Sequence, residues 1–359
     1  MSKRSIVPFG PQHPVLPEPI HLDLVLEDEK VVEAIPSIGF VHRGLEKLVE
    51  KKDFNEYVYV AERICGICSF MHGMGYCESV EHIMEVEIPP RAKYLRTIWC
   101  EMSRIHSHLL WLGLLADAFG FESLFMETWR MREKVLDMFE YSTGGRVIFS
   151  VNKIGGQRKD MDNEMIREFL GVFADMERDL KELVKTFLNN SAVNSRLRDV
   201  GFLSKQQAFD LGAVGPFMRS SGISRDTRKL GYAAYSSLDF EPITSDVGDS
   251  YARTDVRIRE IFQSIDIIRQ AAAKIPDGEV SVPVKGFPQG EYFMRVEQPR
   301  GEAIYYVKAN GTKFLDRMRV RTPTFANLPG MLETMKGCQL ADIPILILTI
   351  DPCISCTER

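Results

Sequence analysis

The stretch that decides the fold is RICGICSFMH at residues 63–72, where Cys65 and Cys68 form a Cys-x-x-Cys pair. A second such pair begins at Cys353, in DPCISCTER at residues 351–359. Two thiolates at this spacing can bind one metal ion from a single turn, and two pairs provide four sulfur ligands. Because the pairs are 285 positions apart (68 to 353), a shared site requires a fold that brings the two ends of the sequence together.

Spacing alone predicts that the two pairs hold a structural zinc ion or a simple iron–sulfur site. Two observations favour a reacting metal instead. Structural zinc modules take their ligands from one short segment, whereas the second pair here ends at Cys356, far from the first. Charged and proton-binding side chains also flank the thiols, namely Glu62, Arg63 and His72 at the first pair and Asp351 at the second. Such neighbours suit a metal that reacts more than one that only stabilises.

Composition excludes several classes of protein. Hydrophobic residues make up 45% and charged residues 26% of the 359 residues, as in ordinary globular proteins. The net charge of −5 argues against binding to nucleic acid, and an odd count of seven cysteines argues against a disulfide framework. The longest apolar runs, at 109–119 and 343–350, are too short to cross a membrane. Since the N-terminus also lacks a signal-peptide core, we expect a cytosolic protein that partners can hold at a membrane.

Hydrophobic periodicity predicts a mainly α fold. Apolar residues recur at steps of three and four in the segments 91–116, 163–188 and 252–273, and a further helix is expected around 122–141. The apolar faces of these helices predict a multi-helix bundle core. Small β elements are expected near both termini, at 20–26, 31–35, 291–296, 303–309 and, delivering the second cysteine pair, 344–350. Without a visible linker or repeat, we expect a single domain over residues 1–359.

The two cysteine segments resemble a known pair of motifs. RICGICSFMH and DPCISCTER are similar to R-x-C-G-x-C-x-x-x-H and D-P-C-x-x-C-x-x-H/R of the large, catalytic subunit of nickel–iron hydrogenases. Three other stretches resemble the 49-kDa subunit of respiratory complex I: GPQHPVLPEPIHLDL (10–24), GFVHRGLEKL (39–48) and RSSGISRDTRKLGY (219–232). Complex I has lost the cysteines and this chain keeps all four, so it most resembles the membrane-bound, energy-converting (Ech-type) hydrogenases over nearly its full length.

The resemblance implies a role for each thiol. Cys65 and Cys353 would be terminal nickel ligands, while Cys68 and Cys356 would bridge nickel and iron, with carbon monoxide and cyanide also bound to the iron. His72 would hydrogen-bond a bridging cysteine sulfur. The implied reaction is the heterolytic cleavage of H2 and its reverse, the reduction of protons.

Three further residues take catalytic roles through the resemblance. Arg300, in EQPRGE (297–302), resembles the arginine of the family's E-A-P-R-G motif, with Gln298 in place of alanine. That guanidinium would lie over the metal centre. Glu18, in LPEPIHL, occupies the place of the family's proton-relay glutamate, and a positioned carboxylate can shuttle protons. Asp351 is expected to order the second cysteine pair and to contact Arg300.

The resemblance also suggests an additional magnesium or iron ion near the C-terminus. Glu46, in HRGLE, resembles a family glutamate that helps to hold that ion. The family often supplies a C-terminal histidine as well, whereas this chain has Arg359, which cannot ligate a cation. We expect Arg43 and Arg63 to be structural ion-pair partners.

The implied partners follow from the need to move electrons. The remaining cysteines, 77, 100 and 338, are scattered and predict no further cluster, so a small subunit with a [4Fe–4S] cluster is expected. The resemblance adds a polyferredoxin subunit, ferredoxin, and integral membrane subunits that translocate ions. The chain would then lie on the cytoplasmic side of the membrane, without a transmembrane segment of its own.

Two rival hypotheses stay open at this point. The first is a complex I-like subunit that shapes a quinone chamber without hydrogenase activity; His13, in GPQHP, matches a quinone-site histidine of complex I. The second is a binding protein that zinc or an iron–sulfur cluster stabilises. His106 and His108 lie two positions apart on a predicted helix and are expected to be ordinary helix residues that point in different directions.

Overall fold

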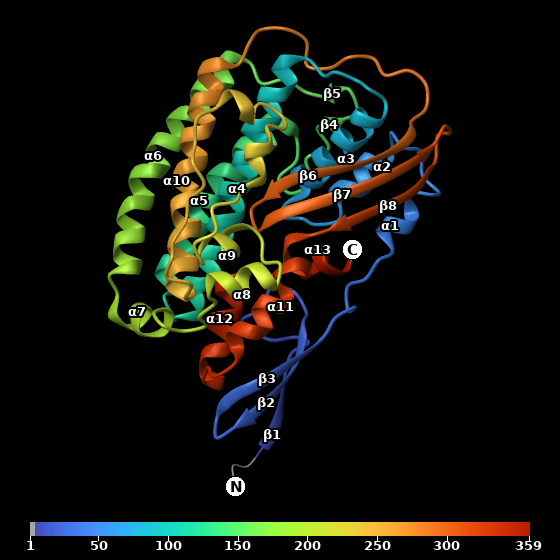
Figure 1. The fold of residues 1–359 in the computed structure, drawn as a ribbon. Coiled ribbons are helices and arrows are strands. Elements are labelled where there is room, and N and C mark those ends of the chain that lie inside the picture. Colours follow the sequence, from blue (N-terminus) through green and yellow to red (C-terminus); the bar gives the residue numbers. More distant parts are fainter. Residues whose placement is uncertain (1–3) are drawn as a thin grey trace.

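The computed structural model describes residues 4–359 and is mainly helical, with three small antiparallel sheets (Figure 1). Four long helices run side by side: α4 (Pro90–Ala118), α5 (Glu122–Thr143), α6 (Asn163–Leu188) and α10 (Ser250–Lys274). They confirm the four helices expected from periodicity, and α6 has the expected bounds. Helix α4 is buried on most of its surface because α5 and α10 pack against it. The bundle core therefore surrounds α4.

Local sequence signals explain where these helices begin and end. Pro90 occupies the first turn of α4, where its missing N–H is not needed. The Asp162 carboxylate caps α6 by accepting the backbone N–H of Met165. Helix α5 ends at Gly144, whose φ of +85° is a left-handed conformation that glycine adopts without strain.

The first sheet lies at the N-terminal end of the described chain, with strand order β1-β2-β3. Its strands are β1 (Arg4–Phe9), β2 (His21–Glu27) and β3 (Lys30–Ser37). Alternation along β2 buries Leu22, Leu24 and Leu26 in the same hydrophobic cluster as Leu328 and Met331 of α11 (Pro323–Met335), and β3 contacts that helix. The sheet thus packs on a segment near the opposite end of the sequence.

The third sheet, of order β6-β7-β8, lies beside the helical bundle. Its strands are β6 (Gln289–Gln298), β7 (Gly301–Asn310) and β8 (Leu315–Arg321), and they contain the segments predicted at 291–296 and 303–309. One face packs on α3 (Ser69–Ile83) so closely that a side chain at Gly75 would lie 2.5 Å from the Tyr305 ring. Pro299 and Arg300 alone form the turn from β6 to β7, so Arg300 is held at the tip of a hairpin.

Short elements complete the chain. They are α1 (Leu45–Leu48), α2 (Tyr57–Glu62), β4 (Asn152–Lys153), β5 (Gly156–Gln157), α7 (Ser191–Leu197), α8 (Lys205–Asp210), α9 (Gly215–Arg219), the 3₁₀ turns η1 (Thr227–Leu230), η2 (Tyr235–Ser237) and η3 (Leu340–Asp342), and helices α12 (Ile343–Ile350) and α13 (Ile354–Glu358). Within residues 4–359, none of the helices combines the length and the apolar character that a membrane crossing requires.

The strand predicted at 344–350 is wrong, since this segment is helix α12. A short apolar run that is buried on all sides fits a strand and a helix equally well. Pro344 in the first turn favours the helix, and donors from the bundle satisfy its last carbonyls. The indole of Trp111 donates to the Leu348 oxygen at 2.7 Å, and the Arg257 guanidinium donates to the Thr349 oxygen at 2.6 Å and the Ile350 oxygen at 2.8 Å. This cation at the helix C-terminus also favours the helix dipole.

The end of α12 supplies a test of the fold. Replacing Trp111 by Phe removes the N–H and leaves the Leu348 carbonyl buried without a partner, which should lower the free energy of unfolding by about 1–3 kcal/mol. Urea denaturation would measure the loss. Trp129→Phe is the matched control, because the Trp129 indole N–H has no hydrogen-bond partner within the described chain. Equal losses in the two variants would contradict this role for Trp111.

Candidate metal centre

The four cysteines of the two pairs come together in one buried cluster. The Sγ atoms of Cys65 and Cys353 are 3.4 Å apart, and those of Cys68 and Cys356 are 3.3 Å apart. A disulfide would require about 2.05 Å. Two sulfurs that each lie about 2.3 Å from one metal ion can be separated by these distances. Each thiol is at most 2% exposed, so the cluster is shielded from water.

Helix starts hold the two pairs in place. Cys68 immediately precedes α3 and Cys353 immediately precedes α13, and the positive end of a helix favours a thiolate. The backbone N–H groups of Ile67 and Cys68 point to the Cys65 sulfur at 3.2 and 3.5 Å. Thr324 accepts the backbone N–H of Cys353 at 3.0 Å.

The chemistry of this donor set fits a metal group. Hydrogen bonds from the neighbouring thiols of Cys353, Cys356 and Cys68 hold the pKa of Cys65 well below its usual value. Burial raises the pKa of Cys68 and of Cys356, because a second or third thiolate without a compensating cation is unfavourable in a dry site. Metal cations bound by sulfur would provide that compensation and would ionise the remaining thiols.

His72 lies against the second pair. Its Nε2 is 3.4 Å from the Cys356 sulfur, and the Tyr305 hydroxyl is 2.8 Å from its Nδ1. The Gln298 amide donates to Tyr305 at 2.9 Å, so the Tyr305 hydroxyl is free to donate to Nδ1. The Gln298 amide nitrogen also lies 3.3 Å from Nε2, and the ring would donate to the sulfur in the tautomer that carries its hydrogen on Nε2. Burial lowers the pKa of His72 to about 4, so the ring is neutral at pH 7.

Arg300 is fixed beside the cluster. Its guanidinium donates to the Asp351 carboxylate at 2.7 Å, to the Asp351 backbone oxygen at 2.8 Å and to the Ser107 hydroxyl at 3.2 Å. Burial alone would lower the pKa of Arg300, but the charges of Asp351, Cys353 and Cys65 raise it, so the side chain stays charged. The contact expected between Arg300 and Asp351 is present. Asp351 Oδ2 has no hydrogen-bond partner in the described residues.

Glu18, in the N-terminal loop before β2, contacts the residues that lie between Cys353 and Cys356. Its carboxylate accepts the backbone N–H groups of Ile354 and Ser355, the latter at 3.1 Å, and also the Ser355 hydroxyl. The side chain is half-buried. The glutamate expected to relay protons is therefore placed between the two cysteines of the second pair.

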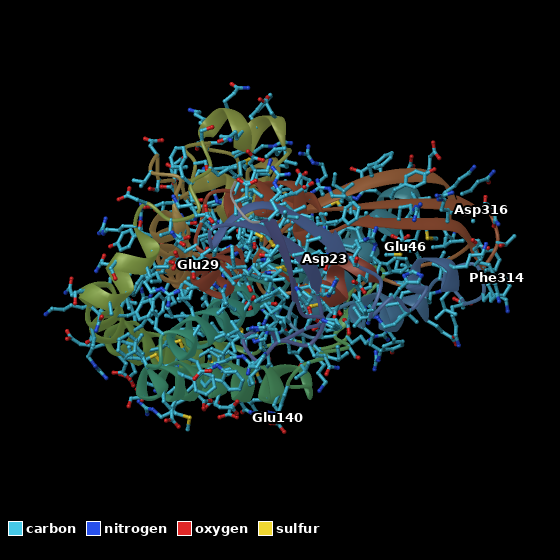
Figure 2. The ribbon with its side chains drawn as sticks, turned by 90° about the horizontal axis from the view of Figure 1, so that it is seen from below. Asp23, Glu29, Glu46, Glu140, Phe314 and Asp316 are labelled. Carbon is cyan, nitrogen blue, oxygen red and sulfur yellow. The ribbon has the colours of Figure 1, made fainter. Side chains whose placement is uncertain are left out.

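Glu46 does not fit the additional ion. It belongs to α1, which packs against β8, and is labelled in the view from below (Figure 2). Arg319 donates to it at 2.7 Å, the Val320 N–H at 2.8 Å and Arg359 at 2.8 Å. Although burial alone would raise the pKa of Glu46, these three donors lower it. Two guanidiniums occupy the carboxylate where a divalent cation would bind, so we do not assign an ion there.

Several residues of the site have no signal in the sequence. The guanidinium of Arg43, expected in an ion pair, binds instead the backbone oxygens of Arg63, Ile64 and Ser355 at 3.0, 2.9 and 2.8 Å. It thereby joins the loop of the first cysteine pair to that of the second. The Arg63 side chain donates to a backbone oxygen of α2.

His106 also supports the first pair. This residue of α4 is fully buried, and its Nε2 lies 2.8 Å from the Ile67 oxygen, between the two cysteines. The prediction that His106 and His108 point in different directions is confirmed, since His108 contacts Glu260 on α10 at 3.1 Å. The prediction that both are ordinary helix residues did not foresee the contact of His106 with the loop between Cys65 and Cys68. No sequence spacing relates a helix residue to a loop 39 positions earlier.

Known protein families match the chain along most of its length. The family described as the 49-kDa subunit of the respiratory-chain NADH dehydrogenase matches residues 118–287 and 283–359. The family described as nickel-dependent hydrogenase matches residues 43–117, which include the first cysteine pair.

Individual relatives extend this similarity to nearly the whole chain. The chain is 39% identical to the carbon monoxide-induced hydrogenase of Rhodospirillum rubrum, over 98% of this chain and 99% of the relative. It is 38% identical to the membrane-bound hydrogenase subunit alpha of Pyrococcus furiosus, over 98% and 87%. The fold matches a chain of the membrane-bound sulfane sulfur reductase, an archaeal respiratory membrane complex, with a TM-score of 0.95 and 30% identity over 99% of this chain and 98% of the other. The chain therefore belongs to the family that unites the large subunits of membrane-bound, energy-converting nickel–iron hydrogenases with the 49-kDa subunit of the respiratory NADH dehydrogenase.

Proposed function

We propose that this chain is the catalytic subunit of a nickel–iron hydrogenase that cleaves H2 heterolytically and, in reverse, reduces protons. The observation that carries the proposal is the convergence of four buried thiols from both ends of the chain, with Arg300 and a neutral His72 beside them. The hydrogenase relatives, aligned over almost the whole chain, support the same conclusion.

The four thiols would hold the metal group, with Cys65 and Cys353 on nickel and Cys68 and Cys356 between nickel and iron. When bound, that group supplies an open coordination position for H2 and accepts or donates the electrons, with carbon monoxide and cyanide as the other iron ligands. The protein excludes water from this position, because all four thiols are buried.

Arg300 and His72 act on the charge that the reaction creates. The Arg300 guanidinium is held in a fixed orientation by Asp351, so its positive charge costs no reorganisation when negative charge develops next to it. With its hydrogen on Nε2, His72 would stabilise electron density on the Cys356 sulfur. Both are preorganised donors in a dry site, where electrostatic stabilisation is strong.

Glu18 would move the proton. Its carboxylate is fixed on the turn that carries the second cysteine pair and is also half-buried, so it links the thiols to the N-terminal loop. A carboxylate with this access can accept a proton at the site and release it toward solvent.

The proposal includes partners. Of residues 4–359, only the thiol cluster gathers three or more potential metal ligands, so electrons must enter through another subunit. We propose a small subunit with a [4Fe–4S] cluster, a polyferredoxin subunit with ferredoxin as the electron carrier, and membrane subunits that translocate ions. Relatives described as membrane-bound support a peripheral position on a membrane complex, and we propose that the chain lies on the cytoplasmic side.

A second candidate function has its own support. The family of the 49-kDa NADH dehydrogenase subunit matches the larger part of the chain, and a complex I-like subunit shapes a quinone chamber instead of cleaving H2. The two functions differ in whether the thiol cluster carries nickel and iron. Measurement of the metals therefore separates them.

The first test is infrared spectroscopy of the anaerobically purified complex, with nickel and iron quantified in the same sample. Carbon monoxide and cyanide bands with one nickel per chain are expected. Cys68→Ser should abolish the bands and the nickel, because a serine hydroxyl does not replace a bridging thiolate. Cys338→Ser is the control, since this half-buried thiol donates to the Thr334 oxygen and lies outside the thiol cluster. A fully matured complex without nickel would refute the function, and zinc in its place would indicate a structural site.

Arg300→Lys tests the role of the guanidinium. Lysine keeps the charge but replaces the planar guanidinium, whose three nitrogens contact Asp351 and Ser107, by one ammonium group, so the hydrogenase rate should fall by about 10²-fold while nickel content is unchanged. H2 oxidation with an artificial electron acceptor would measure it. Arg319→Lys, in an exposed ion pair with Glu46, is the control and should keep the wild-type rate. Equal rates in both variants would show that the Arg300 guanidinium does not contribute to the reaction.

Glu18→Gln tests the proton relay. Glutamine still accepts hydrogen bonds but carries no proton to transfer, so hydrogen–deuterium exchange by the complex should slow by about 10²–10⁴-fold with unchanged infrared bands. Glu358→Gln is a matched control, because Glu358 also accepts two backbone N–H groups, those of Gly39 and Val41. If both variants exchange at the wild-type rate, protons leave by a route without Glu18.

A further inference from the structure

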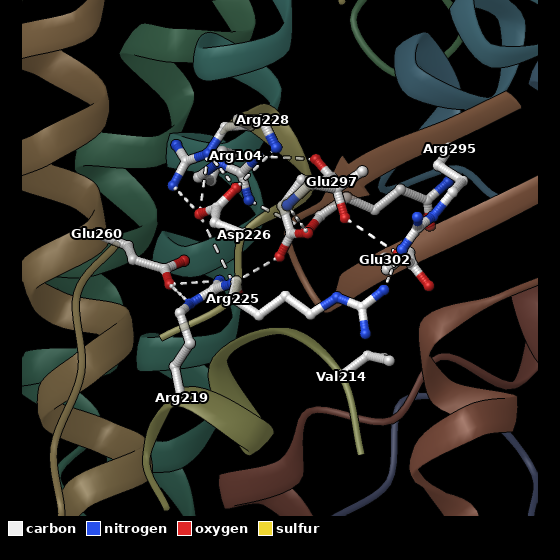
Figure 3. Close-up of polar contacts among 12 residues, drawn as sticks. Arg104, Val214, Arg219, Arg225, Asp226, Arg228, Glu260, Arg295, Glu297 and Glu302 are labelled. Atoms are coloured by element: carbon white, nitrogen blue, oxygen red, sulfur yellow. Dashed lines mark hydrogen bonds and ion pairs between the residues drawn. The ribbon is translucent and has the colours of Figure 1, made fainter. Parts of the chain in front are cut away.

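A second group of charged residues lies buried between the helical bundle and the third sheet (Figure 3). It contains three guanidiniums, four carboxylates and one imidazole: Arg104, Arg219, Arg228, Glu101, Asp226, Glu260, Glu297 and His108. Their side chains are at most 2% exposed. The proposed reaction uses none of them.

The contacts of this buried network are continuous. Arg219 donates to Glu260 at 2.7 Å and to Glu297 at 2.8 Å, and it lies 3.6 Å from Asp226. Arg228 joins Asp226, at 2.7 Å, to Glu101, at 3.2 Å. Salt screens buried charges much less than exposed ones. A change of charge at one group therefore changes the electrostatic potential at its neighbours.

The network holds one carboxylate more than it holds guanidiniums. Burial lowers the pKa of His108 to about 4, so this ring adds no positive charge at pH 7. Arg257, the next buried guanidinium, contacts backbone oxygens and pairs with none of the four carboxylates. An unpaired buried negative charge is strongly unfavourable, so the network has the capacity to bind one proton when further negative charge is added nearby.

Glu297 is the carboxylate best placed to bind this proton. Although burial alone raises the pKa of Glu101 and of Glu260, nearby guanidiniums hold both values below the usual range. For Glu297 burial prevails, and the charge of Asp226 raises its pKa further. The sequence register adds a cause, since Glu297 on β6 stands directly opposite Glu302 on β7. Like charges in this position repel each other.

Glu302 is the partner that stays ionised. Its oxygens accept from Arg295 and, at 2.5 Å, from Arg321, and the exposed Arg225 lies 3.6 Å away. Burial alone would raise the pKa of Glu302, but these arginines lower it. Thr227 connects the two acids, because its N–H donates to Glu297 at 3.1 Å and its hydroxyl to Glu302 at 3.4 Å.

A small cavity gives Glu297 a route to solvent. It measures about 20 Å³, and its lining includes Glu297, Glu302, Thr227 and the exposed Arg225. This volume accommodates about one water molecule, and the polar lining offers that water several partners. A proton can therefore pass between the surface and the Glu297 carboxyl through this cavity, beside Glu302.

The end of β6 also contacts the metal centre, through the residue that follows Glu297. Gln298, the next residue, places its amide 3.3 Å from Nε2 of His72, which contacts the Cys356 sulfur. Arg104 binds the backbone oxygens of both Glu297 and Gln298, at 2.8 and 3.1 Å. Consecutive Cα atoms are about 3.8 Å apart, so one rigid strand end connects the network to the thiol cluster.

We propose that Glu297 is a redox-linked protonation site, which takes up one proton from solvent when the metal centre gains an electron and returns it when the centre is oxidised. The proposal rests on the function proposed above. The electron comes from the redox partner and the proton from water, so the added negative charge is balanced by an added positive one. No bond other than the O–H of the carboxylic acid is formed or broken at Glu297.

Every element packed around Glu297 contributes to its proton equilibrium. The charged groups that face it are Arg219 from α9, Asp226 and Arg225 from the following loop, Arg104 from α4, and Glu302 from β7. The Tyr232 hydroxyl accepts its backbone N–H at 3.0 Å. The guanidiniums are permanently charged, so the groups of the network that can bind a proton are its carboxylates and His108.

Redox-difference infrared spectroscopy of the intact complex tests the proposal. On reduction, the C=O band of a protonated carboxylic acid should appear and should move to lower frequency in D2O. Glu297→Gln should abolish the band and should reduce proton uptake, measured with a pH indicator, by about one proton per chain. Glu297→Asp keeps an acid and should shift the band, which covers the case that the glutamine variant does not fold. Glu291→Gln, an exposed acid on the same strand, should leave the band unchanged.

The same spectra separate this inference from the proposed function. Absent carbon monoxide and cyanide bands would refute the hydrogenase function, and the inference with it. If those bands are present and respond to reduction, but the carboxylic acid band is absent or survives Glu297→Gln, only the inference is overturned. A Glu297 band of equal intensity in both redox states would also overturn it, because the proton would then be permanent.

Discussion

The rest of the structure depends on holding four thiols from opposite ends of the chain in one dry place. Without a bound cation, these groups oppose one another, as the raised pKa of Cys68 and of Cys356 shows. The fold therefore has to fix each loop from outside the cluster. Trp111 and Arg257 hold the end of α12, His106 holds the loop of the first pair, and Arg43 joins the two. Helices α4 and α10 supply three of these four residues, so the bundle acts as the frame of the site.

The helices that position the site also contain buried charged residues. Arg104, Arg219, Arg228 and Arg257 are fully buried, and each is satisfied by carboxylates or backbone oxygens rather than by water. Such groups add little stability compared with apolar packing, but removing one partner leaves an uncompensated charge. Their geometry is therefore tightly determined, which keeps the hairpin of Arg300 in one position relative to the thiols.

The sequence predicted the parts of the molecule in which a pattern repeats or a motif is local. The periodicity of α6 gave its bounds, and the two cysteine motifs identified the four thiols that the structure brings together. The strand prediction for 344–350 was wrong because a fully buried segment is apolar throughout. It lacks the alternation of polar and apolar residues that distinguishes a strand from a helix. The ion pair predicted for Arg43 was wrong for another reason, and the two guanidiniums on Glu46 were not foreseen for the same one. An isolated arginine or glutamate does not encode whether it meets a carboxylate, a backbone oxygen or an ion, since distant segments decide this.

The two acids proposed to handle protons differ in how they are held, and this difference suits different tasks. Glu18 is half-buried, and its donors belong to the turn between the thiols, so a proton can leave the centre through it. Glu297 is fully buried behind Gln298 and His72, and two guanidiniums, those of Arg104 and Arg219, hold it in place. A proton there lowers the cost of added electron density without taking part in the reaction. Transfer and compensation of charge would thus occur on separate sides of the same centre, and each could change without disturbing the other.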